Sequence, residues 1–401
     1  MTTTSMTGAR MTHRNKVRLH IDAMSIYGIG LIIYFAFASI YVFPSGLPQP
    51  GDYLIAAASG FLLLTSFAIG RSYKAVVFFS FLFVLYAFCI SAIWAALVSD
   101  PDMLRIPAYY LFNFIVFLSV IVAASRAPDR TFNILKYAAM AGVASLVMQL
   151  AVSFNFSLRR QSLGFNNPNQ LAYFSLCLCG ILLLLRHSGK LSFYMFAGLY
   201  AACSLALLMS FSATGTVAWL FSLGIILFSQ SKRSKWTFVG TALLLLASGW
   251  VIYISVTQDT YFSESLTYRI GRLEAKTQDI SAQRGYDRIV EFAQYTFFGA
   301  GEAGRWRFGK FGDKELHSTV GTLIFSYGIV GTTIFAAFLL STVRRASLFH
   351  WSVLGIPFLY ALTHQGLRAT MFWIFLATLS ASVVLSRKKR LDRSPHLTVR
   401  Q

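Results

Sequence analysis

Residues 75–99 read AVVFFSFLFVLYAFCISAIWAALVS, a run of 25 residues without a single charged side chain. A helix needs about 20 apolar residues to cross the hydrocarbon core of a bilayer, so this run is long enough to do so. The rest of the chain is similar, because 56% of its 401 residues are hydrophobic and 12% are charged, against roughly 25% charged in soluble domains. We therefore predict an all-α protein embedded in a membrane.

Twelve apolar runs of this kind occur along the chain, and they predict a bundle of about 12 transmembrane helices with both termini on one side. The runs cover residues 24–43, 53–70, 75–99, 107–125, 131–153, 170–186, 192–209, 213–229, 236–256, 317–341, 350–363 and 369–386. The predicted parts are a basic N-terminus (1–23), nine helices (24–256), one large loop (257–316), three helices (317–386) and a basic tail (387–401).

The positive charges predict how this bundle is oriented. The formal net charge is +20, and 22 of the 35 Lys and Arg residues fall in the termini and in the loops on one side. The short loops on the other side contain Arg105, Arg159, Arg160 and Arg368. By the positive-inside rule both termini lie in the cytoplasm, and the loop 257–316, in which basic and acidic residues balance, lies outside. Because topology accounts for the excess positive charge, we expect no nucleic-acid partner.

The four cysteines, Cys89, Cys177, Cys179 and Cys203, all fall within predicted helices. They therefore cannot crosslink the external loop, and the pair at 177 and 179 has no nearby histidine or acidic residue with which to form a metal site. We predict neither a metal ion nor a cofactor.

The stretch RRQSLGFNNPNQLAYF (159–174) precedes the sixth predicted helix on the external side. Asn167 is a good N-cap and the proline after it suits the first helical position, so the free N–H groups of this helix face outward. A helix N-terminus attracts anions, and Arg159 and Arg160 lie a few residues before it. We predict that these arginines bind an anionic substrate together with Asn167 and Asn169. The alternative is an ordinary cap beside arginines that contact lipid headgroups.

Residues 282–298 (AQRGYDRIVEFAQYTFF), within the large loop, have the apolar spacing of an amphipathic helix, which Gly299 and Gly301 would end. Arg284 and Arg288 lie one turn apart on its polar face, where two guanidinium groups could hold a pyrophosphate. In the alternative interpretation this face is simply solvated, and both arginines pair with neighbouring acidic residues.

A histidine precedes the tenth predicted helix in the stretch ELHSTVGTLIFSYGIVG (315–331). His317 is a candidate general base, because an imidazole pKa near 6.5 suits proton abstraction at neutral pH. Glu315 could orient it, and the serine that follows could cap the helix; the alternative is a histidine that only caps the helix or contacts headgroups. His364 and Arg368 flank the last external turn and form a further candidate polar pair.

These stretches together resemble the O-antigen ligase and Wzy-type polysaccharide polymerase family, over about residues 150 to 340. Three motifs carry the resemblance, in the order in which the family shows them. They are Arg160 eight residues before Pro168 within GFNNPNQLA (164–172), Arg284 upstream of Gly299-Ala300-Gly301 in the large loop, and His317 before Gly328-Ile329-Val330-Gly331.

The resemblance implies a metal-independent membrane glycosyltransferase of the GT-C type in a bacterial inner membrane, with its active site facing the periplasm. Such a polymerase of O-antigen, capsule or exopolysaccharide transfers a glycan chain from undecaprenyl pyrophosphate to a sugar hydroxyl of the next lipid-linked repeat unit. The arginines would stabilise the pyrophosphate leaving group, and His317 would accept the hydroxyl proton. Membrane lipids, a chain-length regulator and a flippase are the partners that the resemblance suggests.

Two other functions stay open. An O-antigen ligase would transfer the chain to lipid A-core instead, but Ala213 stands where such ligases often have an arginine at the start of the eighth span, which favours the polymerase. A transporter or a flippase of lipid-linked glycans would also have about twelve helices. It should, however, place ionisable residues near the middle of its helices, where this sequence has almost none.

Overall fold

The computed structural model describes residues 22–44, 47–153, 160–230, 285–311 and 316–392, and all regular secondary structure within these ranges is helical. The α-helices are α1 (Ala23–Phe37), α2 (Pro50–Ser66), α3 (Lys74–Val98), α4 (Arg105–Arg126), α5 (Pro128–Ser153), α6 (Pro168–His187), α7 (Phe193–Met209), α8 (Ala213–Gln230), α12 (Asp287–Glu291), α13 (Thr319–Ser326), α14 (Gly328–Thr342), α15 (Leu348–Ala361) and α16 (Thr370–Asp392). Short 3-10 turns occupy Arg71–Tyr73, Pro101–Leu104, Ala293–Tyr295 and Arg305–Phe311.

Five of the described helices are long and apolar enough to cross a membrane, which supports a helical membrane protein. They span Arg71–Val98, Pro101–Arg126, Pro128–Val152, Pro168–His187 and Thr370–Asp392. Of the twelve predicted runs, 236–256 lies outside the described residues. Ten of the others each coincide with one helix, although several of these helices, such as α1 and α15, are shorter than 18 residues, and the run 317–341 is divided between two.

The predicted helix 317–341 is wrong as a single span. The chain turns between α13 and α14, because Gly328 has a φ of +63°, which lies in the left-handed region. Glycine adopts this conformation at little cost, whereas other residues rarely do. A half-length helix, α13, therefore starts the segment, and α14 continues it in another direction.

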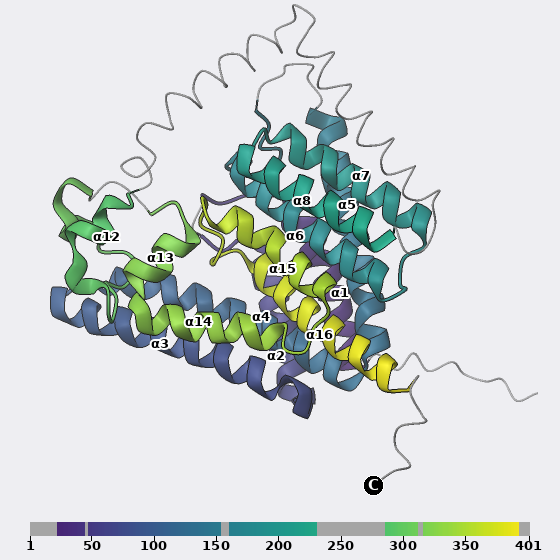
Figure 1. Ribbon diagram of the computed structural model, residues 1–401, viewed down its shortest axis with the longest axis horizontal. Helices are drawn as coiled ribbons and strands as arrows, with labels where there is room; N and C mark the ends of the chain where they lie inside the picture. Colours follow the sequence, from purple (N-terminus) through teal and green to yellow (C-terminus); the bar gives the residue numbers. More distant parts are fainter. Residues whose placement is uncertain (1–21, 45–46, 154–159, 231–284, 312–315, 393–401) are drawn as a thin grey trace, which may run out of the picture.

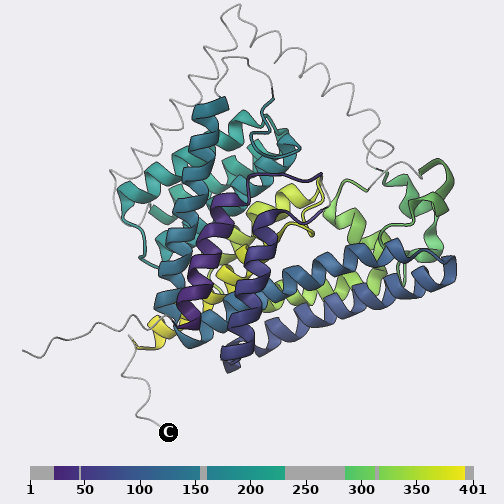
Figure 2. The ribbon, with the colours of Figure 1, turned by 180° about the vertical axis from the view of Figure 1, so that it is seen from behind.

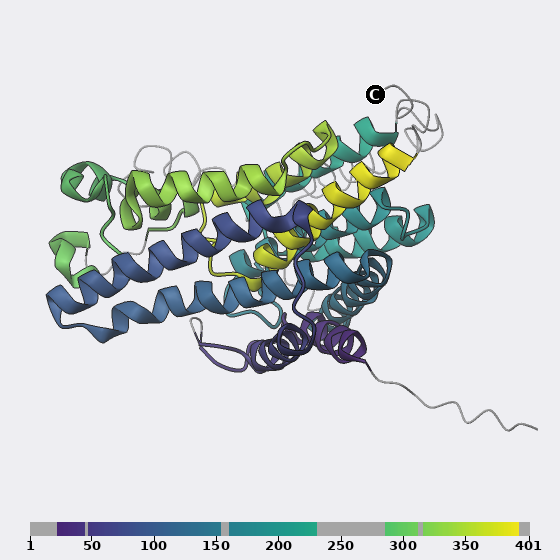
Figure 3. The same ribbon diagram turned by 90° about the horizontal axis from the view of Figure 1, so that it is seen from below.

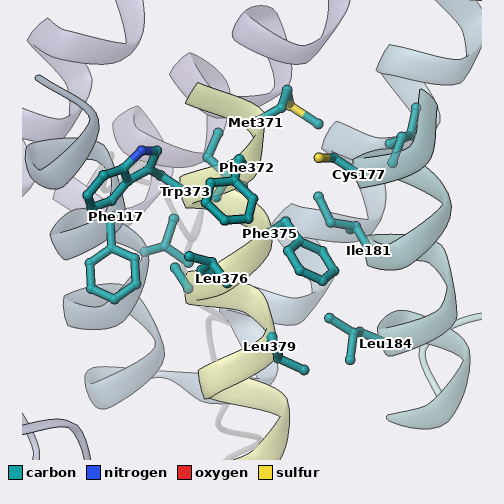
Figure 4. Close-up of a cluster of buried hydrophobic side chains, with 14 of the residues drawn as sticks. Phe117, Cys177, Ile181, Leu184, Met371, Phe372, Trp373, Phe375, Leu376 and Leu379 are labelled. Atoms are coloured by element: carbon teal, nitrogen blue, oxygen red, sulfur yellow. The ribbon is translucent and has the colours of Figure 1, made fainter. Parts of the chain in front are cut away.

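The centre of the bundle is formed by α6 and α16. Every side chain from Leu171 to Leu185 is buried, so α6 is enclosed on all sides. The ring of Phe375, which extends from α16 towards α6 (Figure 4), meets α6 at Gly180, where a Cβ atom would be 2.6 Å from its edge. Helices in lipid are held together mainly by close packing, because lipid tails are as apolar as the side chains. Gly180 permits that close approach.

Small residues also join the first two helices, which lie side by side on one face of the molecule (Figure 2). A Cβ atom on Gly30 would be 2.5 Å from the Cβ of Ala58. The two backbones approach this closely only because neither side chain is larger, which is the usual way in which membrane helices pack.

The described loops meet at two opposite ends of the bundle. At one end, called the basic end here, the starts of α1 and α5 lie with the ends of α6 and α16. The contacts there are Arg130–Asp22 (2.6 Å), Lys190–Asp129 (2.8 Å) and Lys389 Nζ to the Ser188 carbonyl (3.2 Å). These are loops for which the sequence predicts a common side.

The opposite end, called the site end here, comprises the described parts of residues 38–49, 160–169, 210–214, 285–319 and 362–369. In Figure 1, α12 and α13 lie at this end, beside the tips of α3 and α14. Figure 3 shows that α3, α4 and α14 run alongside one another towards it. Most of the predicted external loops therefore converge here, although they are far apart in the sequence.

Candidate functional site

The start of α6 lies at the site end, as the sequence predicts. Asn167 is its N-cap, with Oδ1 accepting a hydrogen bond from the Asn169 amide (2.8 Å), and Pro168 occupies the first helical position. The guanidinium of Arg160 donates to the Asn169 side-chain carbonyl and, through Nε, to the Ser210 carbonyl (3.0 Å). An exposed arginine therefore lies beside a helix N-terminus, which is an arrangement suited to binding an anion.

The position of Arg160 bears on the arginine that is absent at Ala213. Ser210 directly precedes the turn into α8, and Ser212 Oγ accepts a hydrogen bond from the amide of Gly215 in the first turn of α8 (3.3 Å). Arg160 thus brings positive charge to the start of α8 from another segment.

The segment 285–311 departs from the predicted helix 282–298. Within the described residues its α-helix is only α12, and the backbone leaves helical geometry at Phe292 (φ −115°, ψ 49°). Val290 and Phe297 of the predicted apolar stripe are largely exposed, so this stripe does not pack against the protein. Side chains from distant parts of the chain bury the other face instead.

Arg288 is the residue that this packing encloses. Its side chain is 2% exposed, its Nη2 donates to the Phe311 carbonyl (2.8 Å), and its guanidinium carbon lies 5.2 to 5.6 Å from the rings of Phe308, Phe311 and Phe325. Burial, with a smaller effect of Arg305, lowers the pKa of Arg288 to about 10. The predicted role of Arg288 as an open pyrophosphate ligand does not fit this environment. Its companion Arg284 lies outside the described residues, so the predicted pair stays untested.

Arg307 approaches the other side of the same aromatic cluster. Its guanidinium carbon lies 4.9 Å from the Phe308 ring centroid and 4.8 Å from that of Trp94, and Nη2 donates to the Ala300 carbonyl (2.6 Å). Cation–π contacts of this kind are stronger where water is excluded. The two arginines hold the segment 285–311 together and join it to α3.

The two glycine motifs of the sequence cross each other at the site end. Four backbone hydrogen bonds join residues 296–301 to residues 325–330: Ala300 N to Phe325 O (2.9 Å), Gly301 N to Ser326 O (2.8 Å), Ile329 N to Thr296 O (2.8 Å) and Val330 N to Phe297 O (3.3 Å). Cβ atoms on Gly299 and Gly328 would each lie 2.4 Å from a carbonyl oxygen of the other segment. We call this contact the glycine crossing.

His317 lies in the irregular segment that leads into α13, and its side chain is exposed. Ser318 is the N-cap, as predicted, with Oγ accepting from the Gly321 amide (3.1 Å). The amide and hydroxyl of Thr319 both donate to the His364 carbonyl, each at 3.1 Å. The predicted partner Glu315 lies outside the described residues.

The loop 362–369 joins several of these elements. The Tyr360 hydroxyl donates to the Asn169 carbonyl (2.7 Å), and Thr363 Oγ1 donates to Thr214 Oγ1 at the start of α8 (2.8 Å). The His364 ring stacks on the Tyr360 ring, with centroids 4.4 Å apart. His364 thus contributes through packing and through its carbonyl, which bonds Thr319 at the start of α13, while Tyr360 and Thr363 reach the starts of α6 and α8.

Glu302 is a residue of this site that the sequence did not single out. Its carboxylate is buried, and it accepts hydrogen bonds from Arg368 Nε (3.0 Å) and Nη2 (2.7 Å) and from the Tyr110 hydroxyl (2.5 Å). The sequence feature that could have identified Glu302 as a site residue is its place directly after Gly299-x-Gly301. In the sequence it is one of nine acidic residues that balance the charge of a long loop.

Backbone strain also gathers at the site end. Leu163, Phe211 and Ala303 have φ values of 50°, 48° and 65°, which non-glycine residues seldom adopt. Each such residue costs on the order of 1–3 kcal/mol and persists where surrounding contacts hold it, commonly at functional sites.

No family model matches the chain, and none of the curated proteins matches it. Within the part of the chain that the structure describes, no group of three His, Cys, Asp or Glu side chains could hold a metal ion. What the site end presents is Arg160 beside a helix N-terminus, Arg368 on a buried carboxylate and the exposed His317. Arg159 lies outside the described residues.

Proposed function

We propose that this chain is a membrane glycosyltransferase of the polysaccharide-polymerase type. It transfers a glycan from a polyprenyl diphosphate to a sugar hydroxyl of a second lipid-linked unit, on the outer face of a bacterial inner membrane. The proposal includes a bundle of about twelve helices related to the GT-C type, with both termini in the cytoplasm. The glycan transfer needs a site that binds the diphosphate leaving group and a group that accepts the proton of the acceptor hydroxyl.

The observation that carries the proposal is the convergence of the three sequence motifs at one end of the bundle. Arg160 and the α6 start lie more than 100 residues before the glycine crossing and His317 with α13, yet Tyr360, the loop 362–369 and Glu302 join them. A leaving diphosphate gains negative charge as the glycosidic bond breaks. Positioned guanidinium groups and a helix N-terminus stabilise such charge best where water is scarce.

The distribution of buried charge supports an enzyme over a transporter. Among the described residues, the charged side chains that are buried are those of Arg288 and Glu302, and neither lies within one of the long apolar helices. Transporters of ionic or polar cargo place such residues near the middle of the membrane. In this protein the buried charged side chains of Arg288 and Glu302 lie at the site end instead.

The test is polymer production in a strain that lacks the chain, complemented with wild type, Arg160→Ala or His317→Ala at matched membrane expression. Arg130→Ala, at the basic end, is the control for loss of an arginine. The readout is a gel that resolves polymer length and attachment to lipid A. We expect short or no polymer and accumulated single lipid-linked units in the deletion strain, full rescue by wild type and Arg130→Ala, and no rescue by the other two variants.

Other outcomes point to the alternatives. Long chains that accumulate on the polyprenyl carrier without reaching lipid A would identify a ligase. Unchanged glycans in the deletion strain would refute both transferase functions and favour transport. Full rescue by His317→Ala would show that His317 does not accept the proton, and it would not contradict the polymerase function.

A further inference from the structure

The ion pair between Glu302 and Arg368 is asymmetric in its exposure. The Glu302 side chain is 3% exposed, whereas that of Arg368 is 32% exposed. The carboxylate therefore lies beneath the surface and the guanidinium lies above it. Solvent, or a ligand at the site end, meets the cation and not the anion.

The geometry fixes this guanidinium closely. Both Nε and Nη2 of Arg368 donate to one carboxylate oxygen, at 3.0 and 2.7 Å, while the Tyr110 hydroxyl holds the other oxygen at 2.5 Å. The backbone is held as well, because the Asn113 amide donates to the Arg368 carbonyl (3.1 Å). Tyr110 and Asn113 are both fully buried in α4.

We propose that Glu302 is a positioning residue that orients Arg368 to bind the diphosphate of the lipid-linked donor, with Tyr110 fixing the carboxylate. The inference deepens the proposed function and rests on it for the identity of the donor. A long side chain that is already ordered loses less freedom when it binds a ligand, and a preorganised guanidinium can bind two phosphate oxygens at once. The Arg368 side chain stays 32% exposed in this arrangement, so a ligand can reach it.

The proposal makes a prediction opposite in sign to that of simple electrostatics. Glu302→Gln makes the site end more positive by one charge, so Coulomb attraction alone would tighten the binding of an anion. If Glu302 instead orders Arg368, the same variant binds an anion more weakly, by about three- to tenfold, since one rotamer-rich side chain must now be ordered on binding. The direction of the change separates the two explanations.

The experiment measures binding of inorganic pyrophosphate to the purified full-length protein in detergent by calorimetry. The variants are Glu302→Gln, Tyr110→Phe, Arg368→Lys and the double variant Glu302→Gln/Arg368→Lys. Asp22→Asn, which removes the carboxylate of an ion pair at the basic end, is the matched control. We expect weaker binding in the first three variants, little further loss in the double variant because the two residues act as a unit, and no change in the control.

Tighter or unchanged binding in Glu302→Gln overturns the proposal, as does the absence of pyrophosphate binding by the wild type. If Glu302→Gln does not yield folded protein, Tyr110→Phe decides, because it keeps the ring and removes only the hydroxyl: weaker binding supports the proposal and unchanged binding refutes it. Weaker binding in these variants together with unchanged glycans in the deletion strain would refute the polymerase function alone. Normal polymer length in Glu302→Gln cells, with unchanged pyrophosphate affinity, would refute the positioning role alone.

Discussion

Gly328→Ala is the substitution that tests the glycine crossing most directly. Two effects oppose the new methyl group. Gly328 has a φ of +63°, and a Cβ there would lie 2.4 Å from the Phe297 carbonyl oxygen and 2.7 Å from the Gly299 amide nitrogen. Both are backbone atoms, which cannot rotate away as a flexible side chain could. The two segments must therefore separate.

The free energy of this change can be worked out from the contacts. An alanine in the left-handed conformation costs about 1–2 kcal/mol relative to glycine. Overlap of the new methyl group with the backbone of the other segment costs about 1–3 kcal/mol more. The four backbone hydrogen bonds of the crossing are lost on opening in wild type and variant alike, so they do not add to this difference. Relative to its open state, the closed crossing is thus destabilised by about 3 kcal/mol. Since 1.4 kcal/mol is a factor of ten, its opening becomes about 100-fold more frequent.

Hydrogen–deuterium exchange of the protein in detergent measures this opening. We expect the amides of Ala300, Gly301, Ile329 and Val330 to exchange about 100-fold faster in Gly328→Ala, with loss of polymer in the complementation assay. Gly198→Ala is the matched control, because Gly198 lies within α7 and has no atom within 4 Å of the Cβ position. It should exchange and function as wild type does.

Unchanged protection of those four amides in Gly328→Ala would refute the reasoning, since the crossing would then tolerate an extra atom between two backbones. Faster exchange throughout the bundle would equally count against it, because the argument requires the opening to stay local.

Three further outcomes are expected. Asn167→Ala should lower the stability of the α6 start by about 1 kcal/mol through loss of its cap, and weaken pyrophosphate binding; protected amides in the first turn of α6 would contradict this. Arg288→Met should destabilise the segment 285–311 by about 1–3 kcal/mol, because the Phe311 carbonyl loses its donor, yet leave pyrophosphate affinity unchanged; a clear loss of affinity would restore Arg288 as a ligand. The hydrogen bonds from Arg130, and then that from the Ser25 amide, hold the pKa of Asp22 well below its usual range. Its stabilising contribution is therefore complete above the unfolded pKa near 3.9 and is lost as the pH falls from there towards the lowered folded pKa. The thermal midpoints of wild type and Asp22→Asn should therefore differ by a constant amount above about pH 5 and approach each other as the pH falls below about 4, and a difference that does not shrink there would contradict the assignment.

The helices and their caps were predictable because the signals are local. An apolar run of helix length, Asn167 before proline and Ser318 before an apolar stretch each depend on residues within one or two turns. The gathering of the predicted external loops at one end also followed from the alternation of basic and neutral loops.

The errors came from interactions between distant residues. The spacing of Arg288 fits an amphipathic helix, but the side chains that bury it, Phe308, Phe311 and Phe325, lie 20 or more residues away. Gly328 interrupts an apolar run in the same way as many glycines that membrane helices tolerate. Its left-handed conformation is imposed by contact with Phe297 and Gly299. Glu302 pairs with a residue 66 positions further on.

The enclosure of α6 has a consequence for the order in which the molecule is made. One of its packing partners, α16, is the last of the described helices along the chain, and the ring of Phe375 fills the place beside Gly180. Until α16 has been made, α6 has only lipid on that face. Because no charged side chain lies between Pro168 and Leu185, α6 is stable in the bilayer before α16 is present. When α16 inserts, it replaces the lipid on that face of α6. We therefore expect a chain truncated before Thr370 to insert into the membrane normally but to lack a well-packed core. The bundle would then be completed only when α16 packs against α6.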